Sequence, residues 1–173
     1  MRAIVVYDTW YGDTRRVAEE IARGLAEALH VDPAVLEVGH TSVAVARSAD
    51  LLVVGTPNHF GGPTRGIRQF VRDVTAAGPV PGAIAVFDTC FAGESGKVAE
   101  KLGRMIAGPA ARDSPAPPAL SLLVDGTRGP LHAGELARAR AWGLKLGRVA
   151  ERRSGEVAAS RPEGPGIATV YPA

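Results

Sequence analysis

Short runs of aliphatic, often β-branched residues alternate in this chain with longer segments whose apolar residues recur at helical spacing. The four clearest runs are residues 3–7, 51–55, 83–87 and 120–124, and a weaker run covers residues 36–38. Each clear run is nearly all apolar, which is typical of strands that are covered on both faces. Parallel strands joined by right-handed helical crossovers produce this alternation. The sequence therefore predicts the α/β class: a doubly wound, five-stranded parallel sheet with helices on both faces.

Four amphipathic helices are predicted between and after these strands. Apolar residues three and four positions apart share one face of a helix and mark the side that packs on the sheet. They are Val17, Ile21, Leu25 and Ala28 in the first helix, Ile67, Phe70, Val71 and Val74 in the second, Val98, Leu102, Met105 and Ile106 in the third, and Leu136, Ala139, Trp142 and Leu146 in the fourth. A further short helix is expected at residues 43–48.

The composition fits one globular domain. Of the 173 residues, 46% are hydrophobic and 22% are charged, which excludes a disordered or collagen-like chain. A chain of this length buries enough surface to fold without disulfides or a structural metal. We expect the domain to cover residues 1–150, because residues 151–173 are rich in Pro, Gly and balanced charge without helical periodicity. We interpret them as a C-terminal tail, and the proline-rich residues 110–118 as a surface loop.

Charge and hydropathy argue against nucleic-acid and membrane partners. Lys and Arg together number 20 against 18 Asp and Glu, so no nucleic-acid surface is predicted. No run approaches the roughly 20 apolar residues that a membrane-spanning helix requires. The single cysteine, Cys90, cannot form an internal disulfide, and no N-terminal leader is visible. We therefore expect a cytoplasmic protein.

The expected topology indicates where a ligand would bind. In an open parallel sheet, ligands bind beyond the carboxyl ends of the strands, where connections leave to opposite faces. A strand order of 2-1-3-4-5 would make the segments after the first, third and fourth strands neighbours. These are residues 8–14, 56–64 and 88–96, which we expect to be loops.

The first segment has the composition of a phosphate site. Hydroxyl groups at Thr9 and Thr14, a glycine at position 12 that permits a tight curve, and the free amides of a helix N-terminus would together bind a phosphate dianion. An ordinary strand-to-helix turn capped by Asp13 or Thr14 would use the same residues. Both interpretations remain open from this segment alone.

The second and third segments each present a ring-bearing side chain within a glycine-containing loop. Residues 56–64 carry His59 and Phe60 among two prolines and two glycines, and residues 88–96 carry Phe91. Each composition is also typical of ordinary loops. Their expected convergence favours a slot for a planar ring beside the phosphate site.

Together these segments resemble the FMN-binding site of the flavodoxin-like family. Residues 7–14, followed by Val17-Ala18 and Ile21-Ala22, are similar to its phosphate loop. The similarity continues through Gly55-Thr56-Pro57 and its Gly-Gly-Pro-Thr continuation to residues 129–136, and covers roughly residues 1–150. Tyr11, where many stand-alone flavodoxins have threonine, is more like the flavodoxin domains of flavodiiron proteins and the WrbA-type quinone reductases. A short-chain flavodoxin domain is the nearest description.

The resemblance implies a noncovalently bound FMN and a set of residues that contact it. The phosphate would be held by Thr9, Trp10, Tyr11, Gly12, Asp13 and Thr14. The ring and ribityl chain would be contacted by Thr56, Pro57, Asn58, His59, Phe60 and Gly61. The opposite side of the ring would be covered by Thr89, Cys90, Phe91 and Gly93.

Three functions are compatible with this resemblance. The first is electron transfer to or from a redox partner protein, and the second is an NAD(P)H-dependent reductase of quinones or other small molecules. The third is a flavin-free binding or regulatory module of the same fold. No side chain is predicted to act as acid, base or nucleophile, and the scattered histidines predict no metal site. A homodimer is consistent with the reductases of this fold.

One charged pattern lies outside the predicted cofactor site. Arg65, Arg68 and Arg72 have i, i+3 and i+7 spacing, which places them on one face of a helix. They form either a solvated face or a docking patch for an acidic partner or for the phosphate of a nicotinamide cofactor.

Overall fold

The computed structural model describes residues 1–108 and 117–159. In chain order the elements are β1 (Ala3–Tyr7), α1 (Asp13–Leu29), β2 (Ala34–Glu37), the 3-10 turn η1 (Val38–His40), α2 (Val43–Arg47), β3 (Leu51–Pro57), α3 (Arg65–Ala76), β4 (Ala83–Cys90), the 3-10 turn η2 (Ala92–Glu94), α4 (Lys97–Ala107), β5 (Ala119–Leu123) and α5 (Glu135–Ala159). No helix among the described residues is long and apolar enough to cross a membrane.

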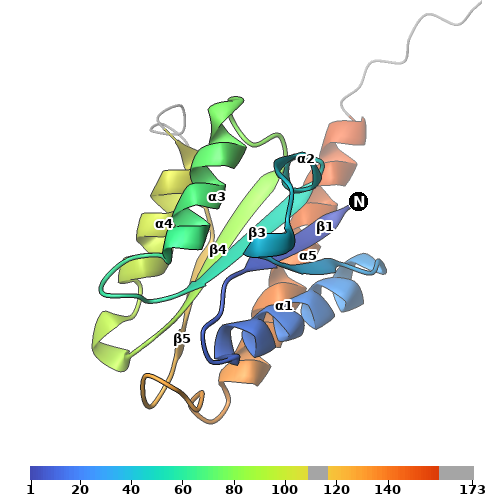
Figure 1. Cartoon of the computed structure of the whole chain (residues 1–173). Helices are drawn as coiled ribbons and strands as arrows, with labels where there is room; N and C mark the ends of the chain where they lie inside the picture. The colour runs from blue at the N-terminus through green and yellow to red at the C-terminus, as the bar shows by residue number, and fades with distance from the viewer. Residues whose placement is uncertain (109–116, 160–173) are drawn as a thin grey trace, which may run out of the picture.

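The strands form one parallel sheet in the order β2-β1-β3-β4-β5. In the central pairing, Val5 lies opposite Val53 and Val53 lies opposite Ala85. Helices α1 and α5 cover one face of the sheet, and α2, α3 and α4 cover the other (Figure 1). The predicted doubly wound, five-stranded sheet with helices on both faces is therefore confirmed.

Two apolar layers hold the helices against the sheet. Because successive residues of a strand point to opposite faces, Val5 packs under α1 and α5, whereas Ile4 and Val6 pack under α2, α3 and α4. The predicted apolar faces of the helices point into these layers. Trp142 of α5 is partly buried against the first layer.

Helices α1 and α5 approach each other to backbone contact. A Cβ at Gly24 would lie 2.1 Å from the carbonyl oxygen of Arg140, and one at Gly143 would lie 2.2 Å from that of Ile21. Glycines at these positions therefore allow a spacing that any side chain would prevent.

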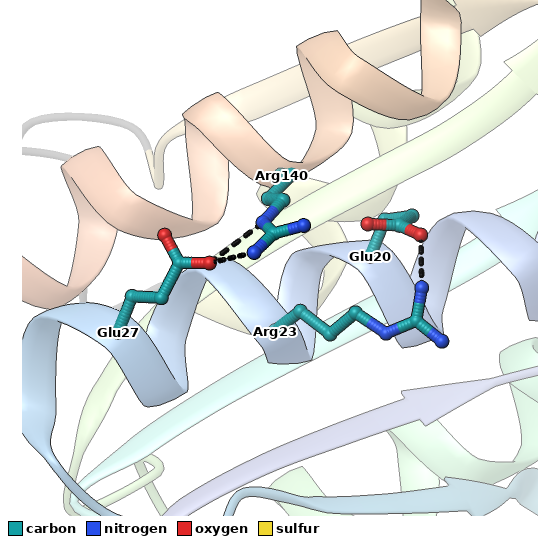
Figure 2. A network of polar contacts seen from close by, with 4 residues as sticks. All are labelled: Glu20, Arg23, Glu27 and Arg140. Atoms are coloured by element: carbon teal, nitrogen blue, oxygen red, sulfur yellow. Dashed lines mark hydrogen bonds and ion pairs between the residues drawn. The ribbon is translucent and has the colours of Figure 1, made fainter.

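Two ion pairs involve the same two helices, one between α5 and α1 and one within α1 (Figure 2). Arg140 of α5 donates through Nε, at 2.7 Å, and through Nη2 to Glu27 of α1. Within α1, Arg23 donates to Glu20. Exposed pairs of this kind contribute about 0–1 kcal/mol each, so the apolar and glycine contacts dominate the stability of this helix pair.

Several boundaries differ from those that the sequence predicted. Strand β3 continues to Pro57 and β4 to Cys90, so the start of each expected loop belongs to a strand. Strand β2 begins at residue 34 and ends at residue 37, and α5 continues through residue 159. The boundary expected at residue 150 thus falls inside a helix, although residues 151–156 are exposed. The rest of the expected tail, residues 160–173, and residues 109–116 of the expected proline-rich loop lie outside the described residues.

Candidate functional site

Four segments at the carboxyl end of the sheet surround one open cavity of about 570 Å³. Three of them are the predicted segments that follow β1, β3 and β4, and the fourth follows β5. The lining residues are Thr9, Trp10, Tyr11, Asp13, Thr14, Pro57, Asn58, His59, Phe60, Gly61, Thr89, Cys90, Phe91, Glu94, Val124, Gly126, Thr127 and Gly129. The volume lies within the roughly 300–1,000 Å³ that is usual for small-molecule sites.

Asp8, directly after β1, ties the first segment to the second. Its Oδ1 accepts the backbone N–H of Thr9 at 2.8 Å, and its Oδ2 accepts the hydroxyl of Thr64 at 2.6 Å. The hydroxyl oxygen of Thr64 also accepts the N–H of Ile67 and so caps α3. One carboxylate therefore fixes the end of β1 relative to the start of α3.

The turn from β1 into α1 leaves several hydrogen-bond donors available. Thr9 Oγ1 accepts the N–H of Gly12 at 3.0 Å, so the Thr9 hydroxyl hydrogen remains to donate. Gly12 has a φ of 96°, a left-handed value that suits glycine, and it is the N-cap of α1 without a side-chain cap. The N–H groups of Asp13, Thr14 and Arg15 have no acceptor within the helix. Such a helix N-terminus favours an anion.

The alternative of a turn capped by the side chain of Asp13 or Thr14 is wrong. The hydroxyl of Thr14 is buried and shares a hydrogen bond of 2.9 Å with the hydroxyl of Thr89, which joins α1 to β4. The carboxylate of Asp13 lies against Gly129, where a Cβ would stand 2.1 Å from Oδ2. Asp13 also accepts from Arg16 at 3.5 Å. Both side chains thus connect the start of α1 to neighbouring segments.

Thr56 connects the two ends of the second segment through hydrogen bonds of its hydroxyl group. Its hydroxyl is fully buried, donates to the carbonyl of Pro57 at 3.0 Å and accepts the N–H of Thr64 at 3.1 Å. These two bonds set the path of the chain as it leaves β3. Thr56 does not line the cavity, so its role in this structure is to position the loop.

The tip of the second segment is a tight turn with a strained aromatic residue. His59 and Gly62 exchange two backbone hydrogen bonds of 2.9 and 3.1 Å. Between them Phe60 has a φ of 49° and Gly61 a φ of 76°. A left-handed non-glycine residue is costly and is found preferentially at functional sites. The side chain of Asn58 stabilises the turn, because its Oδ1 accepts the N–H of Gly61 at 2.9 Å.

Aromatic side chains crowd the cavity without being buried. Trp10, Tyr11, Phe60 and Phe91 are 55%, 51%, 98% and 47% exposed. The rings of Trp10 and His59 lie with centroids 4.1 Å apart, and Arg128 lies 5.7 Å from the centre of the Tyr11 ring. Apart from Met1, these four are the exposed large hydrophobic residues of the described chain. Clusters of exposed aromatic rings are typical of surfaces that bind flat apolar groups.

A buried carboxyl lies next to the cavity wall on the α4 side. Asp88 accepts the N–H of Ala99 at 3.0 Å through Oδ2, whereas its Oδ1 has no hydrogen-bond partner among the described residues. Burial raises the pKa of Asp88 above its usual value. Burial, and then the charge of Asp88, raise the pKa of the Cys90 thiol to about 12. Cys90 is therefore a poor nucleophile, and it lies on a strand, not in a loop as its sequence context predicted.

The segment between β4 and α4 is anchored at two further points. Ser121 Oγ accepts the N–H of Gly96 at 2.8 Å. Glu94 accepts from Lys97 at 3.1 Å, which lowers the pKa of this carboxyl, and it also accepts from the amide of Asn58 at 3.5 Å. The second and third segments are thus linked across the cavity.

Most of the predicted contact residues lie together in this cavity. Thr56, Gly12 and Gly93 are the three that do not line it. Glu94, Val124, Gly126, Thr127 and Gly129 line it but were not predicted as contacts. Four of these five come from the segment after β5, whose turn-forming Asp-Gly and Gly-Pro pairs and position after the last strand were the available signals. No group of three or more potential ligands for a metal ion occurs among the described residues.

Fold and cavity together define a doubly wound α/β protein with an open cavity at the topological switch point of its sheet. Comparison with models of known protein families finds no match, and comparison with curated protein sequences also finds none. Solved structures do share the fold. A flavodoxin from the domain Archaea superimposes with a TM-score of 0.69 at 20% identity, over 87% of this chain and 99% of the flavodoxin.

Two other kinds of protein give similar results. A flavodoxin, WrbA-like protein from Agrobacterium tumefaciens has a TM-score of 0.63 at 21% identity, over 87% of this chain and 98% of its own. The flavodiiron protein from Giardia intestinalis has a TM-score of 0.68 at 17% identity and is matched by 90% of this chain. The chain spans only 37% of that flavodiiron protein. At these identities the likeness shows the fold, which is the flavodoxin-like fold that the sequence predicted.

Proposed function

We propose that this protein binds FMN noncovalently in the cavity and transfers electrons for a redox partner. The observation that carries the proposal is the meeting of an uncapped helix N-terminus with a cluster of exposed aromatic rings in one cavity. One end suits a phosphate and the other suits a flat ring, so the donor set fits the two halves of FMN. The solved structures named as flavodoxins support the same assignment.

The first segment would hold the phosphate. The Thr9 hydroxyl and the N–H groups of Asp13, Thr14 and Arg15 would donate to its oxygens, in the manner of other helix N-termini. The Asp13 carboxylate is partly neutralised by Arg16 and is packed on Gly129, which limits its repulsion of an anion.

The remaining segments would hold the ring. Trp10 and His59 would cover one part of it, and Phe91 and Cys90 would supply apolar contacts from β4 and the segment after it. When bound, FMN supplies the reversible electron transfer. The chain contributes orientation, exclusion of water and the hydrogen-bonding environment that sets the potential.

Flavin binding is tested by comparing FMN with riboflavin, which lacks the phosphate. We would record the visible spectrum of the purified protein, remove any flavin, and titrate both ligands by quenching of flavin fluorescence. Thr9→Val removes the one side-chain hydroxyl proposed to donate to the phosphate, so it should weaken FMN roughly tenfold to a hundredfold, the effect of one hydrogen bond to a charged group, and leave riboflavin unchanged. Thr75→Val is the matched control, because the Thr75 hydroxyl bonds only to its own helix.

The outcomes separate the proposed function from a flavin-free role. Micromolar or tighter FMN binding with the phosphate-dependent loss in Thr9→Val supports the proposal. A colourless protein that ignores FMN at micromolar concentrations contradicts it and favours a binding or regulatory module of the same fold.

A reductase is the second candidate, favoured by Arg128, a cation over the ring of the cavity residue Tyr11 that would attract the phosphates of a nicotinamide cofactor. The FMN-loaded protein would be mixed with NADH or NADPH and a quinone, and nicotinamide oxidation would be followed. Sustained turnover would favour the reductase over the electron carrier. Absence of oxidation with either nicotinamide cofactor would contradict the reductase hypothesis.

A further inference from the structure

The exposed aromatic residues of the cavity lie at its open edge, on the surface that a partner would meet. Phe60 is 98% exposed at the tip of its turn, so the described chain gives its ring almost no cover. Tyr11 and Phe91 are about half exposed on other sides of the cavity. Exposed aromatic side chains that cluster in this way are typical of the anchors of protein interfaces.

Two carboxylates that line the cavity are already paired with cations. Asp13 pairs with Arg16 at 3.5 Å, and Glu94 pairs with Lys97 at 3.1 Å. These contacts reduce the negative field that the carboxylates would otherwise present to an approaching partner.

Four cations on the segment after β5 or within the first five residues of α3 and α4 have no carboxylate within 4.0 Å in the described part of the chain. They are Arg65, Arg68, Lys101 and Arg128, and we call them the basic rim. The chain as a whole has a net charge of only +2, so this surplus is local. Unpaired cations beside an apolar surface attract carboxylates of a partner and accelerate its approach.

The basic rim borders the aromatic residues from more than one element. Arg65 begins α3 directly after the segment that carries Phe60, and Arg68 follows one turn later on the same face. The ammonium of Lys101, on α4, lies 3.6 Å from the position that a Cβ on Gly62 would take. Arg128 follows β5 and lies over the ring of Tyr11.

We propose that the aromatic residues and the basic rim form a docking surface for an acidic protein partner, which presents carboxylates around an apolar spot. This inference rests on the proposed function, since the partner would exchange electrons at the same cavity. A nicotinamide cofactor is the less favoured occupant. Its phosphates need cations that converge on one point, whereas the basic rim is spread over α3, α4 and the segment after β5.

The test uses a peptide of ten glutamates around a central leucine. A peptide with lysine in place of each glutamate is the control of opposite charge. Backbone amide shifts of the isotope-labelled full chain would be followed by NMR, with and without FMN, at about 20 and 200 mM salt. Arg65→Glu with Arg68→Glu reverses two charges of the basic rim. Arg152→Glu with Arg153→Glu makes the same net change on exposed residues of α5 and is the matched control.

The acidic peptide should shift amides of the segments after β3 and β5, and raising the salt should weaken its binding. Charge reversal of Arg65 and Arg68 should weaken peptide binding at least tenfold, whereas charge reversal of Arg152 and Arg153 should weaken it less than twofold. Phe60→Ala should weaken peptide binding several-fold at either salt concentration. Equal losses in the two double variants, stronger binding of the lysine peptide, or preferential binding of NADPH at Arg65 and Arg68 would overturn the proposal. Because the shifts are readable without flavin, a protein that fails to bind FMN but binds the peptide disproves only the proposed function.

Discussion

At the scale of single residues, Asp88 is a carboxyl whose charged form is disfavoured by burial. It lies on β4 with no exposed surface, and one of its oxygens lacks a hydrogen-bond partner among the described residues. Burial raises its pKa above the ordinary value of 3.8. The native protein therefore binds this proton more tightly than the unfolded chain does, and stability falls as the pH rises between the two pKa values.

Asp88→Asn should remove this loss of stability. We expect the variant to gain free energy of unfolding relative to the natural chain as the pH rises from about 4, and then to keep a constant advantage above the native pKa of Asp88. Urea unfolding at several pH values measures the difference. Asp32→Asn, at an exposed position, should show no such trend. The opposite trend would mean that the charged carboxylate stabilises the start of α4.

The Cys90 thiol should be almost inert in the native protein. A pKa of about 12 leaves about one thiol in ten thousand ionised near pH 8, compared with about a quarter of ordinary cysteines. Reaction with an aromatic disulfide reagent should thus be at least about a thousandfold slower in the native protein than in urea. Because the chain has one cysteine, the assay reports on this site alone.

The Asp88→Asn variant provides a second reading of the same thiol. Removing the neighbouring carboxylate should lower the pKa of Cys90 and speed its reaction, since that charge is the second cause of the raised value. A native thiol that reacts as fast as the unfolded one would show that β4 opens readily at its carboxyl end.

At the scale of elements, the contact of α1 with α5 depends on glycine. Gly143→Ala would bring a methyl group to within 2.2 Å of the Ile21 carbonyl oxygen, so the helices must separate. We expect a net loss of about 1–3 kcal/mol, because overpacking outweighs the roughly 1 kcal/mol by which alanine favours a helix. Urea unfolding followed by circular dichroism measures this loss.

Gly155→Ala is the matched control in the same helix. A Cβ at Gly155 would contact nothing within 4 Å, so this variant should gain up to about 1 kcal/mol from helix propensity alone. Similar effects of the two substitutions would show that propensity, and not the close approach of α1, governs this helix.

Elements with strong periodicity were predictable, and their ends were less so. The apolar faces of α1, α3, α4 and α5 and the five strands follow from local patterns. The extension of β4 through Asp88 to Cys90 does not, because polar residues there are buried by α4 and β5, which are distant in sequence. The sequence did not predict that α5 continues past residue 150, because glycine and balanced charge there obscure the helical pattern. Residues 151–156 of this continuation are exposed.

The candidate site was predictable where topology alone brings segments together. The order of the sheet places the segments after β1, β3 and β4 at one edge, and most of their predicted contacts line one cavity. The loop-positioning role of Thr56 and the pairing of Thr14 with Thr89 depend on side-chain geometry that no local pattern encodes. Residues of the segment after β5 also line the cavity, and predicting this required knowing where the last strand lies in the sheet.

At the scale of the whole molecule, four segments spread along the chain between residues 9 and 129 should respond to one ligand as a unit. FMN in excess should slow amide hydrogen exchange in residues 9–15, 57–61, 89–94 and 124–129, because these segments share one cavity. The edge strand β2, which is partly exposed, should be unchanged. Mass spectrometry of the exchanged full chain measures all segments in one experiment.

Riboflavin makes this prediction specific to the orientation of the ligand. Without a phosphate it should protect the aromatic segments but have little effect on the first turn of α1, where the N–H groups of Asp13, Thr14 and Arg15 lack helical acceptors. Equal protection of that turn by both ligands would mean that the phosphate binds elsewhere. Protection that spreads evenly over the sheet would mean that flavin stabilises the fold without occupying this cavity.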